Sequence, residues 1–237
     1  RSRLCFSADL PALGYRTYRL LPSSGEAVPA ALQASDNVLE SDRFRLELDP
    51  ASGCIVSLRD KREEVEVFSG SAALPVVLDD PGDTWGHNIF KWDKVAGMFQ
   101  AESVRLVEHG PVKSVIRVVS GYGSSKLVQD FAMYPDREQI DVSVTVNWQE
   151  ECRMLKLRFP VNVKFMKVTH EIPYGYTERF ANGEEEPAQT WVDVSGISRD
   201  REVPYGFSLL NDGKYSLDVN VRDIGLTVLR SPAYAHH

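Results

Sequence analysis

The residues best suited to chemistry in this chain gather in the stretch of residues 79–93. This stretch combines aspartates, a histidine, an amide and two tryptophans with two glycines. Carboxylates and amides hydrogen-bond the hydroxyl groups of sugars, and an aromatic ring covers the apolar face of a sugar ring. We therefore regard four residues as candidates for binding a carbohydrate: Asp83, Trp85, His87 and Asn88.

A structural interpretation of the same stretch stays open, in which Trp85 and Trp92 fill the core and Asp83 caps a turn. Asp83 and His87 are four residues apart, but a metal site needs further ligands at matching spacing, and none is present. The remaining internal histidines, His109 and His170, are isolated and are interpreted as ordinary surface or core residues. The sequence thus assigns no catalytic and no metal-binding residue to this chain.

A second candidate group lies near the C-terminus, where the polar residues 211–215 separate the apolar runs 203–210 and 226–232. Asn-Asp-Gly tolerates the positive φ angles of a tight turn, so the pattern predicts a hairpin with a site at its tip. Turn geometry explains Asn211 but not Asp212 and Lys214. We expect these two residues to form a charged pair that holds a hydroxyl group or braces another domain.

A third segment, residues 171–191, is predicted to be a long crossover with acidic and aromatic residues. Loops between strands often carry function. The three consecutive glutamates of residues 184–186, however, are typical of a solvated face. We interpret Gln189 and Trp191 as packing residues.

The elements that position these segments are predicted to be β-strands, because apolar residues recur with a period of two from residue 37 onward. The clearest example is the run 140–148. The run 155–161 repeats the pattern, with Lys156 and Arg158 predicted to point outward. We expect ten to twelve strands and no helix of ordinary length. Because half-buried strands need a second sheet over their apolar faces, the predicted fold is all-β, a large antiparallel β-sandwich.

Composition excludes several classes of protein. The 237 residues are 43% hydrophobic and carry a formal net charge of −7, which argues against a nucleic-acid surface. No apolar run reaches the roughly 20 residues of a membrane helix, so no membrane is expected as a partner. Three cysteines at irregular spacing and the lack of a glycosylation sequon favour a reducing, cytoplasmic setting.

The chain is predicted to have two parts. Residues 1–35 combine a predicted strand at 10–20 with a linker-like stretch at 22–30, as at the end of a preceding small β-domain. Residues 36–237 form the second domain. Because the chain begins at Arg1 and ends directly after a predicted strand, we expect this domain to be truncated and the chain to be a fragment of a longer polypeptide.

Three motifs together resemble the C-terminal β-domain of glycoside hydrolase family 38, the α-mannosidases. One is the leucine pair, Asn-Asp, small residue and Lys-Tyr of residues 209–215, followed by the Leu-Arg-Ser-Pro strand of residues 229–232. The others are Asp-Thr-Trp-x-His at 83–87 and Glu-Pro-x-Gln-x-Trp at 186–191. The resemblance covers most of residues 37–237 and implies the supersandwich type of fold that is also found in galactose mutarotases.

The resemblance implies a large enzyme whose N-terminal α/β barrel carries a zinc ion and an aspartate nucleophile and retains the anomeric configuration. Zinc is expected in that missing barrel and no cofactor in this chain, which contains no His-x-Asp pair. The implied partners are an α-mannoside or a related glycan and the N-terminal catalytic domain of the same polypeptide. The resemblance further implies that loops with the candidate residues face the barrel and help to close the sugar pocket.

Two other functions remain open. One is a stand-alone carbohydrate-binding module, although Trp148 and Trp191 fall at core-like positions rather than on a flat platform. The other is an aldose 1-epimerase-like enzyme, whose acid and base would be His87 or His170 with Glu171 or Glu178. The sequence also leaves open whether the protein forms a homo-oligomer.

Overall fold

The protein is all-β, as predicted. The computed structural model describes residues 4–21 and 28–234, and within them the chain forms nineteen strands whose pairings are all antiparallel. The number exceeds the expected ten to twelve because several strands are only two to four residues long. No helix among these residues is long and apolar enough to cross a lipid bilayer.

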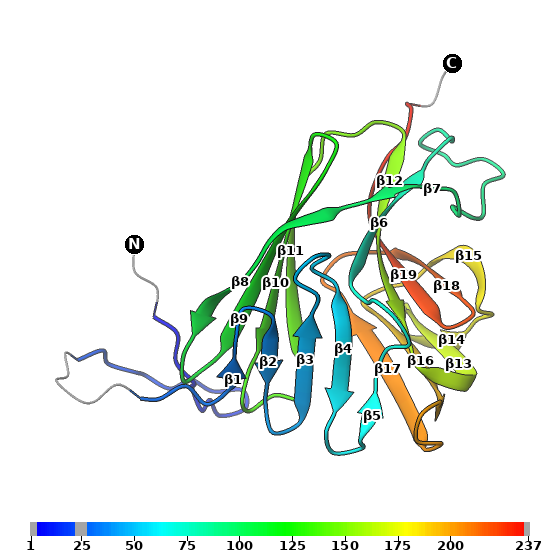
Figure 1. Cartoon of the computed structure of the whole chain (residues 1–237). Helices are drawn as coiled ribbons and strands as arrows, with labels where there is room; N and C mark the ends of the chain where they lie inside the picture. Colours follow the sequence, from blue (N-terminus) through cyan, green and yellow to red (C-terminus); the bar gives the residue numbers. More distant parts are fainter. Residues whose placement is uncertain (1–3, 22–27, 235–237) are drawn as a thin grey trace.

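The strands form four sheets (Figure 1). The first has the order β1-β2-β3-β4-β5: β1 (Gln33–Ala34), β2 (Val38–Glu40), β3 (Phe44–Leu48), β4 (Ile55–Asp60) and β5 (Val65–Glu66). The second has the order β11-β10-β9-β8: β8 (Gln100–His109), β9 (Ser114–Tyr122), β10 (Ser125–Met133) and β11 (Ile140–Asn147).

The other two sheets carry the segments with candidate residues. The six-stranded sheet has the order β15-β18-β19-β12-β6-β7: β6 (Leu74–Asp79), β7 (Val95–Met98), β12 (Arg153–Pro160), β15 (Asn182–Pro187), β18 (Ser216–Asn220) and β19 (Asp223–Ser231). The last sheet has the order β14-β13-β16-β17: β13 (Val163–Ile172), β14 (Gly175–Glu178), β16 (Trp191–Ser198) and β17 (Pro204–Leu210).

One hydrophobic core joins all four sheets and explains the sandwich. It includes Leu46 of β3, Ile116 of β9, Phe131 of β10, Leu157 of β12 and Val194 of β16, each at most 3% exposed. Successive side chains of a strand point to opposite faces, so each sheet gives one apolar face to this core. The outward face of the six-stranded sheet carries both buried ion pairs and a small apolar cluster of Val76, Leu78 and Met154.

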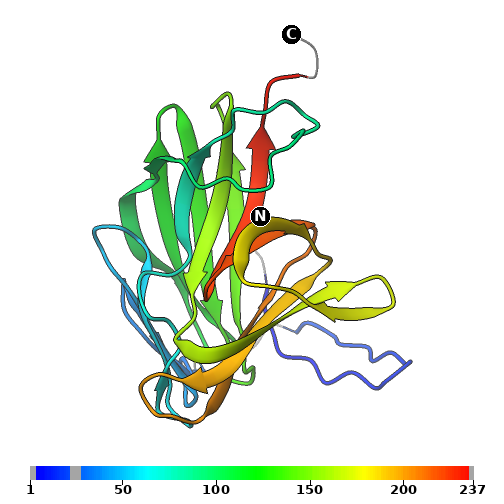
Figure 2. The ribbon, with the colours of Figure 1, turned by 90° about the vertical axis from the view of Figure 1, so that its right-hand side faces the viewer.

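The segment of residues 4–21 contains no strand, so the strand predicted at residues 10–20 is wrong (Figure 2). Leu10 and Leu13 are exposed, and no neighbouring strand of the described chain pairs with the segment. An alternating pattern becomes a strand only where a partner accepts its backbone hydrogen bonds. Residues 22–27 of the predicted linker lie outside the described residues, and the division near residue 35 stays a prediction.

Residues 211–215 do not form the predicted hairpin. β17, which precedes them, pairs with β16, whereas β18, which follows them, pairs with β15 and β19. The predicted return strand at residues 226–232 belongs to β19, in the six-stranded sheet. The turn therefore connects two sheets.

Lys156 does not point into solvent, in contrast to the prediction. Its side chain is completely buried and forms ion pairs with Glu185 of β15 and with Asp218 of β18, the latter at 2.7 Å. Arg158, mostly buried, also pairs with Asp218, at 2.9 Å. Both cations do lie on the face of β12 that points away from the core, but acidic side chains of neighbouring strands cover that face.

Candidate functional site

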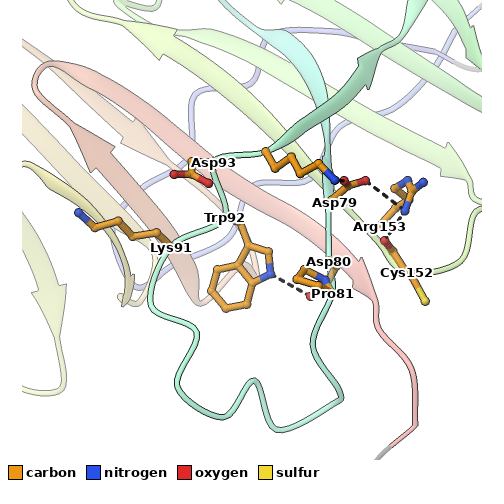
Figure 3. Close-up of a pocket in the computed structure, with 9 residues that line it drawn as sticks. Asp79, Asp80, Pro81, Lys91, Trp92, Asp93, Cys152 and Arg153 are labelled. Atoms are coloured by element: carbon orange, nitrogen blue, oxygen red, sulfur yellow. Dashed lines mark hydrogen bonds and ion pairs between the residues drawn. The ribbon is translucent and has the colours of Figure 1, made fainter.

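The loop of residues 80–94 connects β6 to β7 and is anchored at its base by a buried carboxylate (Figure 3). Asp80 accepts two hydrogen bonds of 2.9 Å from the guanidinium of Arg230 in β19, and its side chain is completely buried. The indole nitrogen of Trp92 donates a third bond of 2.8 Å to the same carboxylate. A bidentate Arg–carboxylate pair fixes distance and orientation together. We call these three residues the loop clamp.

Trp92 completes the clamp by packing as well as by hydrogen bonding. The Arg230 guanidinium lies 4.7 Å from the centre of the Trp92 ring, within the range of a cation–π contact. The ring also packs on a small buried cluster of Val76, Leu78 and Met154. Trp92 is therefore partly buried and helps to hold the base of the loop.

A hollow of about 340 Å³ lies between the base of this loop and the start of β12 (Figure 3). Its walls carry charges of both signs: Lys94 and Arg153 lie 2.6 Å and 3.3 Å from the Asp79 carboxylate. The hydrogen bond from Lys94 lowers the pKa of Asp79. The residues that line the hollow are Asp79, Asp80, Pro81, Lys91, Trp92, Asp93, Lys94, Cys152 and Arg153.

The candidate residues of the loop do not line this hollow; they lie in the outer part of the loop. Oδ1 of Asp83 accepts hydrogen bonds from the backbone N–H groups of Trp85 (2.9 Å) and Gly86 (3.0 Å), so Asp83 closes a turn. Trp85 is 73% exposed, which contradicts its interpretation as a core residue. Its ring stacks on that of His87, with centroids 6.3 Å apart and planes 5° apart. Asn88, also exposed, has a φ of 59°, which asparagine adopts more readily than most residues.

The turn of residues 211–215 is held by its first residue. Oδ1 of Asn211 accepts hydrogen bonds from the backbone N–H groups of Gly213 (3.0 Å) and Lys214 (2.6 Å), and its amide nitrogen donates to the carbonyl oxygen of Gln189 (3.2 Å). Asp212 is exposed and Lys214 half-buried. Within the part of the chain that the structure describes, the expected ion pair between them is not formed. Asn211 thus positions the turn, and the charges of Asp212 and Lys214 remain available to another molecule.

The two candidate groups are connected through β15 rather than by direct contact. The backbone N–H of Glu185 donates to the carbonyl oxygen of Phe90 in the loop (2.8 Å), and that of Ala188 to the carbonyl oxygen of Tyr215 next to the turn (3.1 Å). Among the described residues, no hydrogen bond or ion pair joins the candidate residues of the loop to those of the turn. β15 therefore spaces the two groups apart.

Sequence reasoning missed the loop clamp. Asp80 and Arg230 are 150 residues apart, and no motif connects them. The signal available was indirect: Arg230 lies inside the Leu-Arg-Ser-Pro motif, and Asp80 lies within the acidic stretch. Only the pairing of β12 with both β6 and β19 brings the two residues to the same end of one sheet.

The histidines at the strand ends have different surroundings. Nδ1 of His109 lies 2.9 Å from the Ser114 hydroxyl, as expected for a satisfied residue. His170 is 2% exposed, and its Nδ1 has no hydrogen-bond partner among the described residues. Burial, together with the positive charge of Arg179, lowers its pKa to about 4. Within residues 4–21 and 28–234, no three metal-ligating side chains cluster, and Asp83 and His87 have no third ligand beside them.

Comparison with known families identifies the domain. The family model described as the glycosyl hydrolases family 38 C-terminal domain matches residues 39–237. The chain belongs to this family. Within it, the chain is 28% identical to alpha-mannosidase G of Dictyostelium discoideum over 221 residues, which cover 84% of this chain and 19% of that protein. It is 25% identical to alpha-mannosidase 2C1 of Mus musculus over 254 residues, which cover 94% of this chain and 23% of the relative.

Solved structures of family 38 proteins share the fold. The crystal structure of an alpha-mannosidase from Enterococcus faecalis V583 superposes with a TM-score of 0.74 at 15% sequence identity, over 90% of this chain and 28% of that one. A second family 38 structure from Enterococcus faecalis gives a TM-score of 0.71 over 89% of this chain. The chain spans about a fifth of the length of the curated relatives named above.

Proposed function

We propose that this family 38 C-terminal domain is the non-catalytic β-domain of a retaining, zinc-dependent α-mannosidase. In this proposal the domain packs on the catalytic domain of the same polypeptide and contributes two segments to the sugar pocket. The loop contributes Asp83, Trp85, His87 and Asn88, and the turn contributes Asn211, Asp212 and Lys214. The glycan substrate is an α-mannoside or a related α-linked sugar.

The observation that carries the proposal is an exposed aromatic stack on a fixed loop. Trp85 and His87 stack at the outer part of the loop, with 73% of Trp85 in solvent, while the clamp of Asp80, Arg230 and Trp92 holds the base. A large apolar ring in solvent costs free energy unless another surface covers it. An indole with a carboxylate two residues away matches the apolar and polar faces of a sugar.

The chain's own residues have no part in bond cleavage under this proposal. No group of metal ligands is formed by the described residues, so the donors present here do not fit a zinc site and the zinc is assigned to the catalytic domain. Asp83 and Asn88 would bind hydroxyl groups, Trp85 would exclude water from one face of a sugar ring, and Asp212 and Lys214 would hold further hydroxyls. These contacts orient the substrate.

The test uses hydrolysis of an aryl α-mannoside by the full-length polypeptide that contains this chain. We expect turnover that a zinc chelator abolishes. Trp85→Ala and Asp212→Ala should each lower kcat/KM about tenfold or more, since a positioned contact in a closed site contributes on the order of 1.4 kcal/mol. The matched control is Tyr174→Ala, which removes a fully exposed aromatic side chain at the tip of another turn. Unchanged kinetics of both variants would refute the assignment of the pocket residues.

The epimerase alternative loses one of its two candidate histidines. His170 points into the core, whereas Glu171, the next residue of β13, points to the opposite face of the sheet. A histidine and a glutamate on opposite faces cannot act on one sugar ring. Glu178 also lies on the outer face, because it pairs with Thr169 rather than with His170. Accelerated mutarotation of glucose by the full-length polypeptide would support this alternative through His87.

A further inference from the structure

The outer face of the sheet β14-β13-β16-β17 carries a second hollow, away from the loop of residues 80–94. It is an open depression with a volume of about 450 Å³. Trp191 lies here and not in the core, because its neighbours Val192 and Val194 take the core-facing positions of β16. The residues that line the hollow are Thr169, Tyr176, Trp191, Asp193, Ser208 and Leu210.

Strand register arranges these side chains in two rows. Trp191 lies opposite Leu210 of β17, and Tyr176 of β14 lies opposite Glu171 of β13, which makes one row mainly aromatic and apolar. Two residues further along β16, Asp193 lies opposite Ser208 on one side and Thr169 on the other, which makes a polar row. The rows are about 7 Å apart, as two residues of a strand require.

The polar row presents groups that a sugar hydroxyl can use. The Ser208 hydroxyl donates to Oδ2 of Asp193 over 2.7 Å, which orients the carboxylate and leaves Oδ1 as an acceptor. Thr169 adds a half-buried hydroxyl on the neighbouring strand. The nearby Glu171 directs its Oε2 to the backbone N–H and the hydroxyl of Thr190, both of which donate to it.

The charge of the hollow selects the class of ligand. Its lining contains one carboxylate and no lysine or arginine. The nearest cation of β13, Lys167, is held by Glu178 at 2.7 Å. An anionic ligand would therefore meet Asp193 without a compensating charge, whereas a neutral polyhydroxylated ligand can donate to it. Half-burial of Trp191 fixes its ring in advance, which reduces the entropy lost on binding.

We propose that this hollow is a binding site for a neutral glycan, which stacks a sugar ring on Trp191 and donates a hydroxyl to Asp193. The site begins at Leu210, directly before the turn of residues 211–215, so it extends the candidate surface of that turn along the sheet. Glycan binding here does not require hydrolysis. Only the choice of α-mannan as the first probe rests on the proposed function.

The test is native affinity electrophoresis of the full-length polypeptide in gels that contain soluble α-mannan, soluble β-glucan or, as an anionic comparison, polygalacturonate. We expect retardation by a neutral glycan and none by polygalacturonate. Trp191→Ala should weaken retardation about tenfold or more, as for a central aromatic contact. Asp193→Asn, which keeps the size of the side chain, should weaken it by a smaller factor. Trp191→Phe, which keeps a ring, should bind between the wild type and Trp191→Ala.

Tyr176→Ala and Tyr174→Ala form a matched pair of controls. Both tyrosines belong to the β13–β14 hairpin, but only Tyr176 lines the hollow, and Tyr174 at the tip is fully exposed. Only Tyr176→Ala should reduce retardation. Thermal unfolding of each variant shows whether a loss of binding comes from a loss of folding.

Two results would overturn the proposal: no retardation by either neutral glycan, or equal retardation of the wild type, Trp191→Ala and Asp193→Asn. A large fall in thermal stability of Tyr176→Ala without any glycan binding would indicate that the rest of the polypeptide covers this face. Hydrolysis of an aryl α-mannoside, measured in parallel, separates the two proposals. If retardation depends on Trp191 but the protein does not hydrolyse the aryl α-mannoside, the glycan site is supported and the proposed activity is refuted.

Discussion

At the scale of single residues, Arg230 contacts three residues of the loop 80–94. It pairs with the buried Asp80 and stacks on Trp92. It also donates a bond of 3.3 Å to the carbonyl oxygen of Asp83. One side chain thus fixes the base of the loop and its first candidate residue. Arg230 in β19 therefore helps to position Trp85 and His87 through its bonds to Asp80 and Asp83.

Removal of Arg230 should destabilise the fold. Arg230→Met leaves the fully buried Asp80 carboxylate without its cation, and breaking a buried pair in this way costs about 3 kcal/mol. Urea unfolding should show the loss as a lower midpoint. Arg201→Met is the control, since Arg201 and Glu64 are each at least half exposed and their pair should contribute about 0.5 kcal/mol. Equal effects of the two substitutions would contradict the clamp.

His170 should make stability depend on pH. Its pKa of about 4 in the folded protein lies below the ordinary value of 6.5, because burial and Arg179 disfavour the charged ring. As the pH falls below 6.5, the unfolded chain binds the proton first, so the free energy of unfolding decreases until about pH 4. Across this pH range, protonation of His170 should lower the free energy of unfolding by about 3 kcal/mol.

His170→Gln should lack this dependence. The free energy of unfolding of the wild type minus that of the variant, measured by urea between pH 4 and 7, should fall as the pH falls. Protonation of the carboxylates lowers the stability of both proteins at similar pH. The difference between the two unfolding free energies therefore reports on the histidine. A constant difference across this range would show that His170 is not the group that titrates.

At the scale of elements, β15 is held by charge more than by apolar packing. The middle glutamate of its acidic run, Glu185, is mostly buried and accepts hydrogen bonds from Lys156, Ser216 and Thr227. The prediction of a solvated acidic face is therefore wrong for Glu185. Glu185 also donates its backbone N–H to the carbonyl oxygen of Phe90, so the same residue contacts the loop of residues 80–94.

Glu185→Ala should loosen β15 without unfolding the sandwich. The substitution leaves Lys156 with the Asp218 carboxylate and the carbonyl oxygen of Gly225. We expect hydrogen exchange at β15 amides to become about tenfold faster or more, which corresponds to about 1.4 kcal/mol. Glu184→Ala is the matched control, because among the described residues its carboxylate accepts a hydrogen bond from the nearby side chain of Asn182 alone. Exchange that is equally fast in both variants would contradict a specific role of Glu185.

At the scale of the whole molecule, the chain matches one domain family over most of its length. It spans about a fifth of the relatives to which it is similar, and its described residues form no metal cluster. Large apolar side chains such as Trp85, Phe90 and Tyr215 remain exposed around the two candidate segments. Such a surface is typical of a domain that meets another domain or a ligand.

The isolated chain of 237 residues should therefore not hydrolyse an aryl α-mannoside, whereas the full-length polypeptide should do so. The physical reason is that the proposed nucleophile and metal lie outside this chain. The measurement is release of the aryl alcohol at equal molar concentrations of the two proteins, with circular dichroism to establish that the chain is folded. Turnover by the isolated chain would place an active site inside it and refute the non-catalytic role.

The sequence by itself determined the fold class, the family and several strands. Alternation at residues 140–148 and 155–161 predicted β11 and β12, because a strand with one buried face must alternate. The Asn-Asp-Gly and Leu-Arg-Ser-Pro motifs pointed to the family that the comparison then established. These features are local, so the order of residues is enough to reveal them.

Only the tertiary structure decided which strands are neighbours, and with that which charges meet. The burial of Lys156, the clamp of Asp80 with Arg230 and the outward position of Trp191 all depend on contacts between segments far apart in the chain. Alternation of apolar and polar residues indicates that a strand has two different faces, but it does not indicate what covers each face. For this reason the sequence placed Lys156 in solvent and Trp191 in the core, while the packing of the sheets did the reverse.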